Sequence, residues 1–89
     1  MYVYATERPK LFTDEGQRTF LQIRDRAKYL LKEAGAFRMD EVISKSTGDS
    51  WLMLACVDRM VELGEITECV HKNHPCGQNR IFTNTGWRP

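Results

Sequence analysis

Four side chains of types that bind zinc lie close together toward the end of the sequence. Cys69, His71, His74 and Cys76 fall within eight residues, and zinc prefers sulfur and nitrogen ligands in a closed tetrahedral site. The spacing, however, lacks the Cys-x-x-Cys pair that folds a backbone around the ion. Two incidental cysteines and two histidines in a polar loop explain the cluster more simply. We therefore expect no cofactor, with zinc as the alternative.

The same stretch carries hydrogen-bond donors and cations, and it has no carboxylate from His71 to the end of the sequence. Its polar and basic side chains are Lys72, Asn73, Gln78, Asn79 and Arg80. The strand-forming runs on either side of this stretch predict a hairpin with these residues at its tip. Such groups at a hairpin tip suit phosphate or minor-groove contacts. Polar tips are also common wherever a hairpin faces water, so this pattern alone leaves both interpretations open.

No constellation of residues in the sequence is typical of catalysis. The serines, histidines and aspartates occur in no recognised motif, and neither a Gly-x-Ser-x-Gly elbow nor a phosphate-binding glycine loop is present. We expect a protein that is not an enzyme and that has no small-molecule substrate.

Composition limits the remaining classes of function. The chain has 89 residues, 42% of them hydrophobic and 28% charged, which predicts one compact domain. A net charge of +1 provides no global field that would attract nucleic acid or anionic lipid. Neither an apolar run of about 18 residues nor the apolar core of a signal peptide is found. Three cysteines are an odd number for a disulfide framework and indicate a reducing compartment. The sequence therefore predicts a cytoplasmic protein, and the lack of a long apolar run predicts no membrane partner.

The first half of the chain predicts one long helix. Met1 to Phe12 alternates loosely and indicates a short strand or an arm. Asp14, followed three residues later by Gln17, has the pattern of a capping box. From there to Ala34 apolar residues recur at steps of three and four, and Gly35 stands where a helix ends.

The second half predicts shorter elements. Ala36 to Arg38 is extended, and a short helix begins near Asp40. Asp49 or Ser50 caps another helix that runs to Leu63 and ends at Gly64. Two strand-forming runs, Ile66 to His71 and Arg80 to Thr83, then predict a hairpin.

This order of elements resembles the winged helix-turn-helix family. The residues that carry the resemblance are Asp40-Glu41-Val42-Ile43, the turn Gly48-Asp49-Ser50, the apolar positions Met53, Cys56, Val57 and Met60 before Gly64, and Ile66 at the first wing strand. The resemblance implies an α+β fold in which three helices and a C-terminal β-hairpin wing occupy residues 13–83. A short N-terminal strand or arm at 1–12 and an irregular tail at 84–89 flank this domain.

In DNA-binding members the third helix enters the major groove and the wing contacts the backbone. The resemblance therefore implies nucleic-acid contacts at Ser50, Lys72, Asn73, Gln78, Asn79 and Arg80. The helix from Asp49 to Leu63 departs from this pattern, because Arg59 is its single cation against three carboxylates. A carboxylate that faces a phosphate costs free energy.

The same helix offers a different partner. Its expected outward face includes Trp51, Leu54 and Asp58, and exposed aromatic residues often anchor protein–protein contacts. Trp51 and Leu54 could equally turn inward against the first helix or the N-terminal arm. We expect a small non-enzymatic binding module, with duplex DNA marginally favoured, as in a transcription regulator, and a protein partner as the alternative. The sequence leaves the oligomeric state open.

Overall fold

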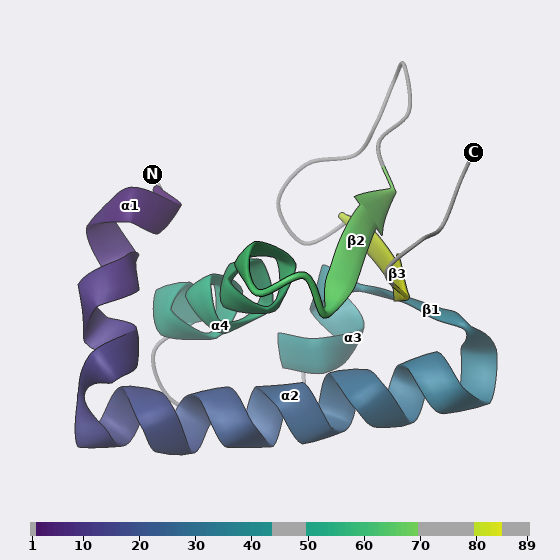
Figure 1. Ribbon diagram of the computed structural model, residues 1–89, viewed down its shortest axis with the longest axis horizontal. Helices are drawn as coiled ribbons and strands as arrows, with labels where there is room; N and C mark the ends of the chain where they lie inside the picture. Colours follow the sequence, from purple (N-terminus) through teal and green to yellow (C-terminus); the bar gives the residue numbers. More distant parts are fainter. Residues whose placement is uncertain (1, 44–49, 70–79, 85–89) are drawn as a thin grey trace.

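The computed structural model describes residues 2–43, 50–69 and 80–84. In Figure 1 the long helix α2 (Asp14–Ala34) forms the base of the molecule, with α3 (Met39–Ile43) and α4 (Ser50–Glu62) above it. The N-terminal helices stand at one end of α2, and a sheet of β1, β2 and β3 lies toward the other. The α+β class predicted from the sequence is confirmed. No helix within these ranges is long and apolar enough to span a membrane.

Helix α2 has the predicted length, but its first turn is capped differently from the prediction. Thr13, not Asp14, is the N-cap, because its hydroxyl oxygen accepts a hydrogen bond from the Gly16 amide at 3.0 Å. Gln17 closes no capping box, since its side-chain amide donates to the Leu11 carbonyl at 2.6 Å. At the other end Gly35 has φ of 81°, the left-handed conformation that ends a helix and that glycine adopts without strain.

The N-terminal segment, Tyr2–Phe12, is helical where we predicted a strand or an arm. It forms α1 (Tyr4–Glu7) and the 3-10 helix η1 (Arg8–Phe12). Pro9 suits the first turn of η1 because its ring fixes φ and the missing amide would have no helical partner there. Leu11 is 1% exposed, so η1 is anchored in the core.

Helices α3 and α4 follow the predicted pattern. The short helix begins at Met39, one residue before Asp40, and α4 begins at Ser50, where a cap was expected. Its predicted inner face is buried and consists of Met53, Cys56, Val57 and Met60. Gly64 has φ of 77° and ends the helix, and the Glu65 amide donates to the Met60 carbonyl at 2.9 Å.

The predicted hairpin is confirmed over the residues that the structure describes. Strands β2 (Ile66–Cys69) and β3 (Ile81–Asn84) pair antiparallel, with Cys69 opposite Ile81. The extended piece β1 (Ala36–Arg38) pairs antiparallel with the other edge of β3, which gives the strand order β1-β3-β2. Asn84, predicted to open an irregular tail, is instead the last residue of β3.

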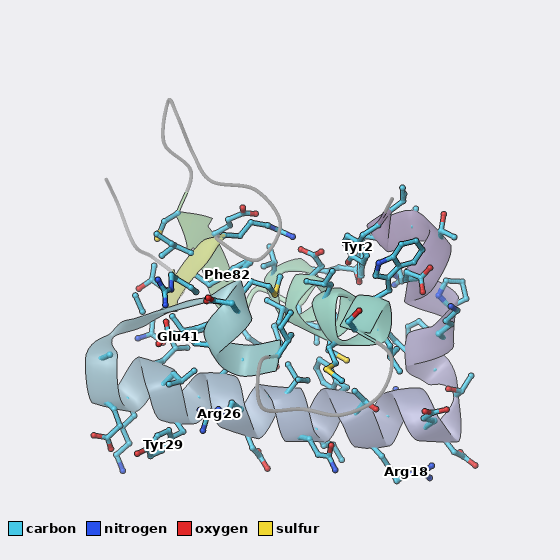
Figure 2. All side chains as sticks on the ribbon, turned by 180° about the vertical axis from the view of Figure 1, so that it is seen from behind. Tyr2, Arg18, Arg26, Tyr29, Glu41 and Phe82 are labelled. Atoms are coloured by element: carbon cyan, nitrogen blue, oxygen red, sulfur yellow. The ribbon has the colours of Figure 1, made fainter. Side chains whose placement is uncertain are left out.

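One hydrophobic core joins the helices to the sheet. Its buried residues come from η1, α2, α3, α4 and all three strands. On the sheet, Phe37 and Phe82 sit opposite each other in register, with ring centroids 5.4 Å apart. Figure 2 shows Phe82 at the sheet end of the molecule, whereas Arg18 and Tyr29 lie along the outer edge of α2.

Gly16 permits η1 to pack closely on the first turn of α2. A Cβ atom at this position would overlap the Lys10 carbonyl oxygen and crowd the Leu11 backbone. We expect Gly16→Ala to lower the free energy of unfolding by about 1–3 kcal/mol, as overpacking does in well-packed sites. Urea unfolding measures the change, with Glu15→Ala on the exposed side of the same turn as the control. Equal stability of the two variants would contradict this close packing.

Candidate interaction surface

The outward face of α4 differs along its length. Steps of three and four residues place Trp51, Ala55, Asp58 and Glu62 on one side of the helix, and we call the last three of these, Ala55, Asp58 and Glu62, the outer stripe. Trp51 is 42% exposed, but Ala55, which the helix pattern places on the outward face, is fully buried. The sequence leaves the direction of Trp51 open, and the structure exposes it, whereas Ala55 in the middle of the helix is buried.

The N-terminal segment contacts this stripe through two tyrosines. The Tyr2 hydroxyl donates to the Asp58 carboxylate at 2.7 Å, and the Tyr4 hydroxyl donates to the Glu62 carboxylate at 2.7 Å. Asp58 and Glu62 are one helical turn apart, so the two tyrosines bind successive turns of α4. Burial and the carboxylate acceptors raise the pKa of both tyrosines, that of Tyr4 to about 12. Figure 2 shows Tyr2 beside α4, on the side of the N-terminal helices.

Glu62 also binds two arginines. Arg8 Nε lies 3.0 Å from both carboxylate oxygens, and Arg59 Nη1 lies 2.7 Å from Oε1. Hydrogen bonds from Tyr4, Arg59 and Arg8 lower the pKa of Glu62 to about 2. Both guanidinium groups lie over the Phe12 ring, 5.2 and 5.3 Å from its centroid. This half-exposed cluster fixes the N-terminal segment to the last turn of α4.

Arg80, a predicted nucleic-acid contact, is engaged inside the chain. Its guanidinium binds Asp58 on α4, with Nη2–Oδ1 at 2.8 Å, and Glu68 on β2, with Nη2–Oε1 at 2.7 Å. The same group lies 5.2 Å from the Phe82 ring centroid. Only 18% of the Arg80 side chain is exposed, and its carboxylate partners raise its pKa. Arg80 therefore joins the base of the hairpin to α4, and a phosphate would have to displace two carboxylates to reach it.

The charges around α4 balance. Three guanidinium groups, Arg8, Arg59 and Arg80, neutralise three carboxylates, Asp58, Glu62 and Glu68. The sequence count of one cation against three carboxylates treats α4 as an acidic surface, but it includes Asp49, which lies outside the described residues. For the two described carboxylates of α4, Asp58 and Glu62, two of the three paired cations belong to other elements. Repulsion of phosphate is therefore weaker than the sequence predicts, and fewer donors remain for a ligand.

The start of α4 is the accessible apolar part of the helix. Ser50 and Trp51 are exposed, and Leu54 is half-buried against the core. The neighbouring Leu52 and Met53 are 4% and 3% exposed, so the helix turns those two side chains inward. Trp51 and Leu54 were predicted as protein contacts together with Asp58. The three residues lie on neighbouring turns of the helix, but the Asp58 carboxylate already accepts hydrogen bonds from Tyr2 and Arg80.

The zinc cluster falls mostly outside the described residues. Cys69 is described and buried, and burial raises the pKa of its thiol, which disfavours the thiolate that zinc binds. Within the described ranges no group of three or more potential ligands is positioned to hold a metal ion. Seven predicted site residues lie outside these ranges: His71, Lys72, Asn73, His74, Cys76, Gln78 and Asn79.

Several residues of this surface were not anticipated from the sequence. Tyr2, Tyr4 and Arg8 were assigned to a strand or arm, and Glu68 was only a strand residue. Their partners are between 12 and 58 positions away in the chain, so no local pattern indicates them. The one available signal was the unexplained pair of carboxylates at a four-residue spacing on α4.

The comparisons with known proteins add no assignment. No protein-family model matches the chain, and no curated protein or solved structure matches it at a significant level. Functional inference therefore depends on the geometry of this chain.

Protonation of Glu62 tests the contact between the N-terminal segment and α4. The pKa of Glu62 is about 2 when folded and about 4.3 in an unfolded chain. A depressed folded pKa gives stability that is present above the unfolded value and lost as the pH falls through the folded one. We expect wild-type stability to fall between about pH 5 and pH 2, and Glu62→Gln to flatten this dependence.

Urea unfolding across this pH range measures the effect, with Glu33→Gln on the exposed side of α2 as the control. If Glu62→Gln and Glu33→Gln show the same pH dependence, the Glu62 cluster does not couple the segment to α4.

Arg80 provides a second test of the internal ion pairs. Its removal leaves Asp58 and Glu68 without their shared cation, so Arg80→Ala should lower the free energy of unfolding by roughly 1–3 kcal/mol. Arg80→Lys should recover part of this loss, because lysine keeps the charge but not the planar fork. Arg38→Ala, which removes an exposed pair with Asp40, should cost about 0.5 kcal/mol or less. An unchanged stability of Arg80→Ala would show that Arg80 is free for other contacts.

Proposed function

We propose that this chain is a non-enzymatic winged-helix module that binds a protein partner through the start of α4. The order of elements supports the winged-helix assignment. A long helix, a short strand, two further helices and an antiparallel hairpin follow one another as the resemblance implies. An α+β fold of this size can serve several kinds of partner, so the surface decides between them.

The hydrogen bonds of the outer stripe with the N-terminal segment are the observation that carries the choice of partner. A helix that enters the major groove must present its outward side chains to base edges. Here Ala55 is buried and Asp58 and Glu62 bind the N-terminal tyrosines. Lengthwise insertion of α4 into a groove would require the N-terminal segment to leave. These contacts of the N-terminal segment therefore favour a partner that binds the start of the helix.

Trp51 and Leu54 give that end an apolar character. Tryptophan contributes a large contact area and is enriched among residues that dominate binding free energy. Leu54 lies one helical turn further on and is half-buried, so it supports a contact centred on Trp51. We take Trp51 as the anchor and Leu54 as the adjacent apolar contact.

Duplex DNA is the second candidate, favoured by the antiparallel pairing of β2 and β3. This pairing makes residues 70–79 the connection of a hairpin, and their sequence includes Lys72, Asn73, Gln78 and Asn79. In this mode the hairpin connection and Ser50 make the contacts, and the rest of α4 makes none. Sequence selectivity would then be low, because phosphate contacts carry little sequence information.

Site-specific photocrosslinking tests the protein partner. A photoreactive phenylalanine analogue in place of Trp51 should give a defined covalent adduct in the cells that produce the protein. The same analogue in place of Tyr29, which is 56% exposed on α2, is the control because it is exposed but distant from α4. Adducts from neither position, or the same adducts from both, would contradict the proposed surface.

Fluorescence anisotropy with a mixed-sequence DNA duplex tests the second candidate. We expect no binding that depends on Lys72. Groove or backbone binding would instead appear at low salt and weaken by a log–log slope of about −0.9 per phosphate contacted. Such a slope, reduced in Lys72→Ala, would replace the protein-partner proposal with DNA binding through the hairpin.

A further inference from the structure

The first residues of the N-terminal segment form a unit of their own. Residues Tyr2–Arg8, which we call the strap, include α1 and end at Pro9. Beyond Pro9 the chain is anchored, because Leu11 is buried and the Thr13 hydroxyl donates to the Lys10 carbonyl at 2.8 Å. The strap also has one buried residue of its own, because Glu7 is 3% exposed and its carboxylate binds the Lys10 ammonium group at 2.8 Å across Pro9.

The internal structure of the strap is slight. Helix α1 has four residues, and its N-cap Val3 provides no side-chain hydrogen bond. The amides of Thr6 and Glu7 both donate to the Val3 carbonyl, at 3.1 and 3.2 Å. A helix this short is not stable on its own. The ion pair of Glu7 with Lys10, the packing of the two tyrosine rings on the core and the contacts with α4 therefore hold it in place. The contacts with α4 include the hydrogen bonds of Tyr2, Tyr4 and Arg8.

The stripe beneath the strap is suited to a replacement ligand. Without the strap, Asp58 would keep Arg80 and Glu62 would keep Arg59, so neither carboxylate would lose all its partners. Each would regain free acceptor positions, and these lie one helical turn apart. A segment with hydroxyl and guanidinium donors at the spacing of the strap would complement this arrangement.

We propose that the strap opens independently of the rest of the domain and competes with a basic, tyrosine- or arginine-bearing segment of the partner for the outer stripe of α4. The partner part of this inference rests on the proposed function, whereas opening of the strap is a property of the isolated chain. A partner bound at Trp51 would gain the stripe only when the strap is released. The strap thus acts as an internal competitor that limits affinity for partners without matching donors.

Hydrogen exchange measures the opening. The amides of Thr6, Glu7 and Arg8 report on the strap, and those of Cys56 and Val57 report on the core of α4. The double variant Tyr2→Phe with Tyr4→Phe keeps both rings but removes both hydroxyls. It should speed exchange of the strap amides by roughly tenfold or more while the α4 amides keep their rates. Tyr29→Phe is the control and should change neither set.

Two results would overturn independent opening. One is exchange of strap and α4 amides at the same rate, which means that the strap opens only when the domain unfolds. The other is an unchanged strap rate in the double variant, which means that the hydroxyls do not hold it. Neither result concerns Trp51, so the proposed function would stand or fall separately.

A peptide supplied in trans tests the stripe as a binding site. A synthetic peptide of residues 1–12 carries the hydroxyl and guanidinium donors of the strap. Added at millimolar concentration to the full-length double variant, it should shift the backbone NMR signals of Asp58 and Glu62. A matched peptide with Tyr2→Phe, Tyr4→Phe and Arg8→Ala should not. Equal shifts with both peptides, or none with either, would overturn the stripe as a site for such segments.

Discussion

Two carboxylates on α4 hold together parts of the chain that lie far apart in sequence. Asp58 accepts from Tyr2 on one side and from Arg80 on the other, and Glu62 gathers Tyr4, Arg8 and Arg59. Arg80 continues the connection to Glu68 on β2. The N-terminal segment and the base of the hairpin are therefore positioned from one side of one helix.

These polar contacts act on geometry more than on total stability. Exposed ion pairs contribute little free energy individually, and the core formed by Leu11, Ile23, Phe37, Met60 and Phe82 supplies the main driving force. Carboxylates with several donors, however, restrict which orientations of the segment and the hairpin are compatible with that core. The apolar core thus makes the domain fold, while the carboxylates select where its two ends lie relative to α4.

Local patterns predicted the elements that obey them. The period of α2, the inner face of α4 and the turns at Gly35 and Gly64 follow from side-chain spacing and from the left-handed backbone at each glycine. The N-terminal segment was missed because its helix is too short to show a period and is stabilised by contacts over 50 positions away. The role of Arg80 was missed for the same reason, since a basic residue beside a polar loop has the same local pattern whether it binds phosphate or Asp58. The sequence leaves the exposure of Trp51 open, because a side chain at this position of the helix can face either the core or the solvent.

The charges of one helix, counted along its sequence, therefore predict the electrostatic potential at its surface poorly. The count for α4 predicts a negative surface that repels phosphate. In the folded chain Arg8 and Arg80 come from other elements and neutralise it. What opposes groove binding is instead that Tyr2 and Tyr4 already bind the carboxylates of the outer stripe, and that the nearby guanidinium groups already bind carboxylates. Apolar contact with the exposed part of Trp51 requires neither these carboxylates nor a free cation. This asymmetry between the middle and the start of α4 is the physical reason to expect a protein there.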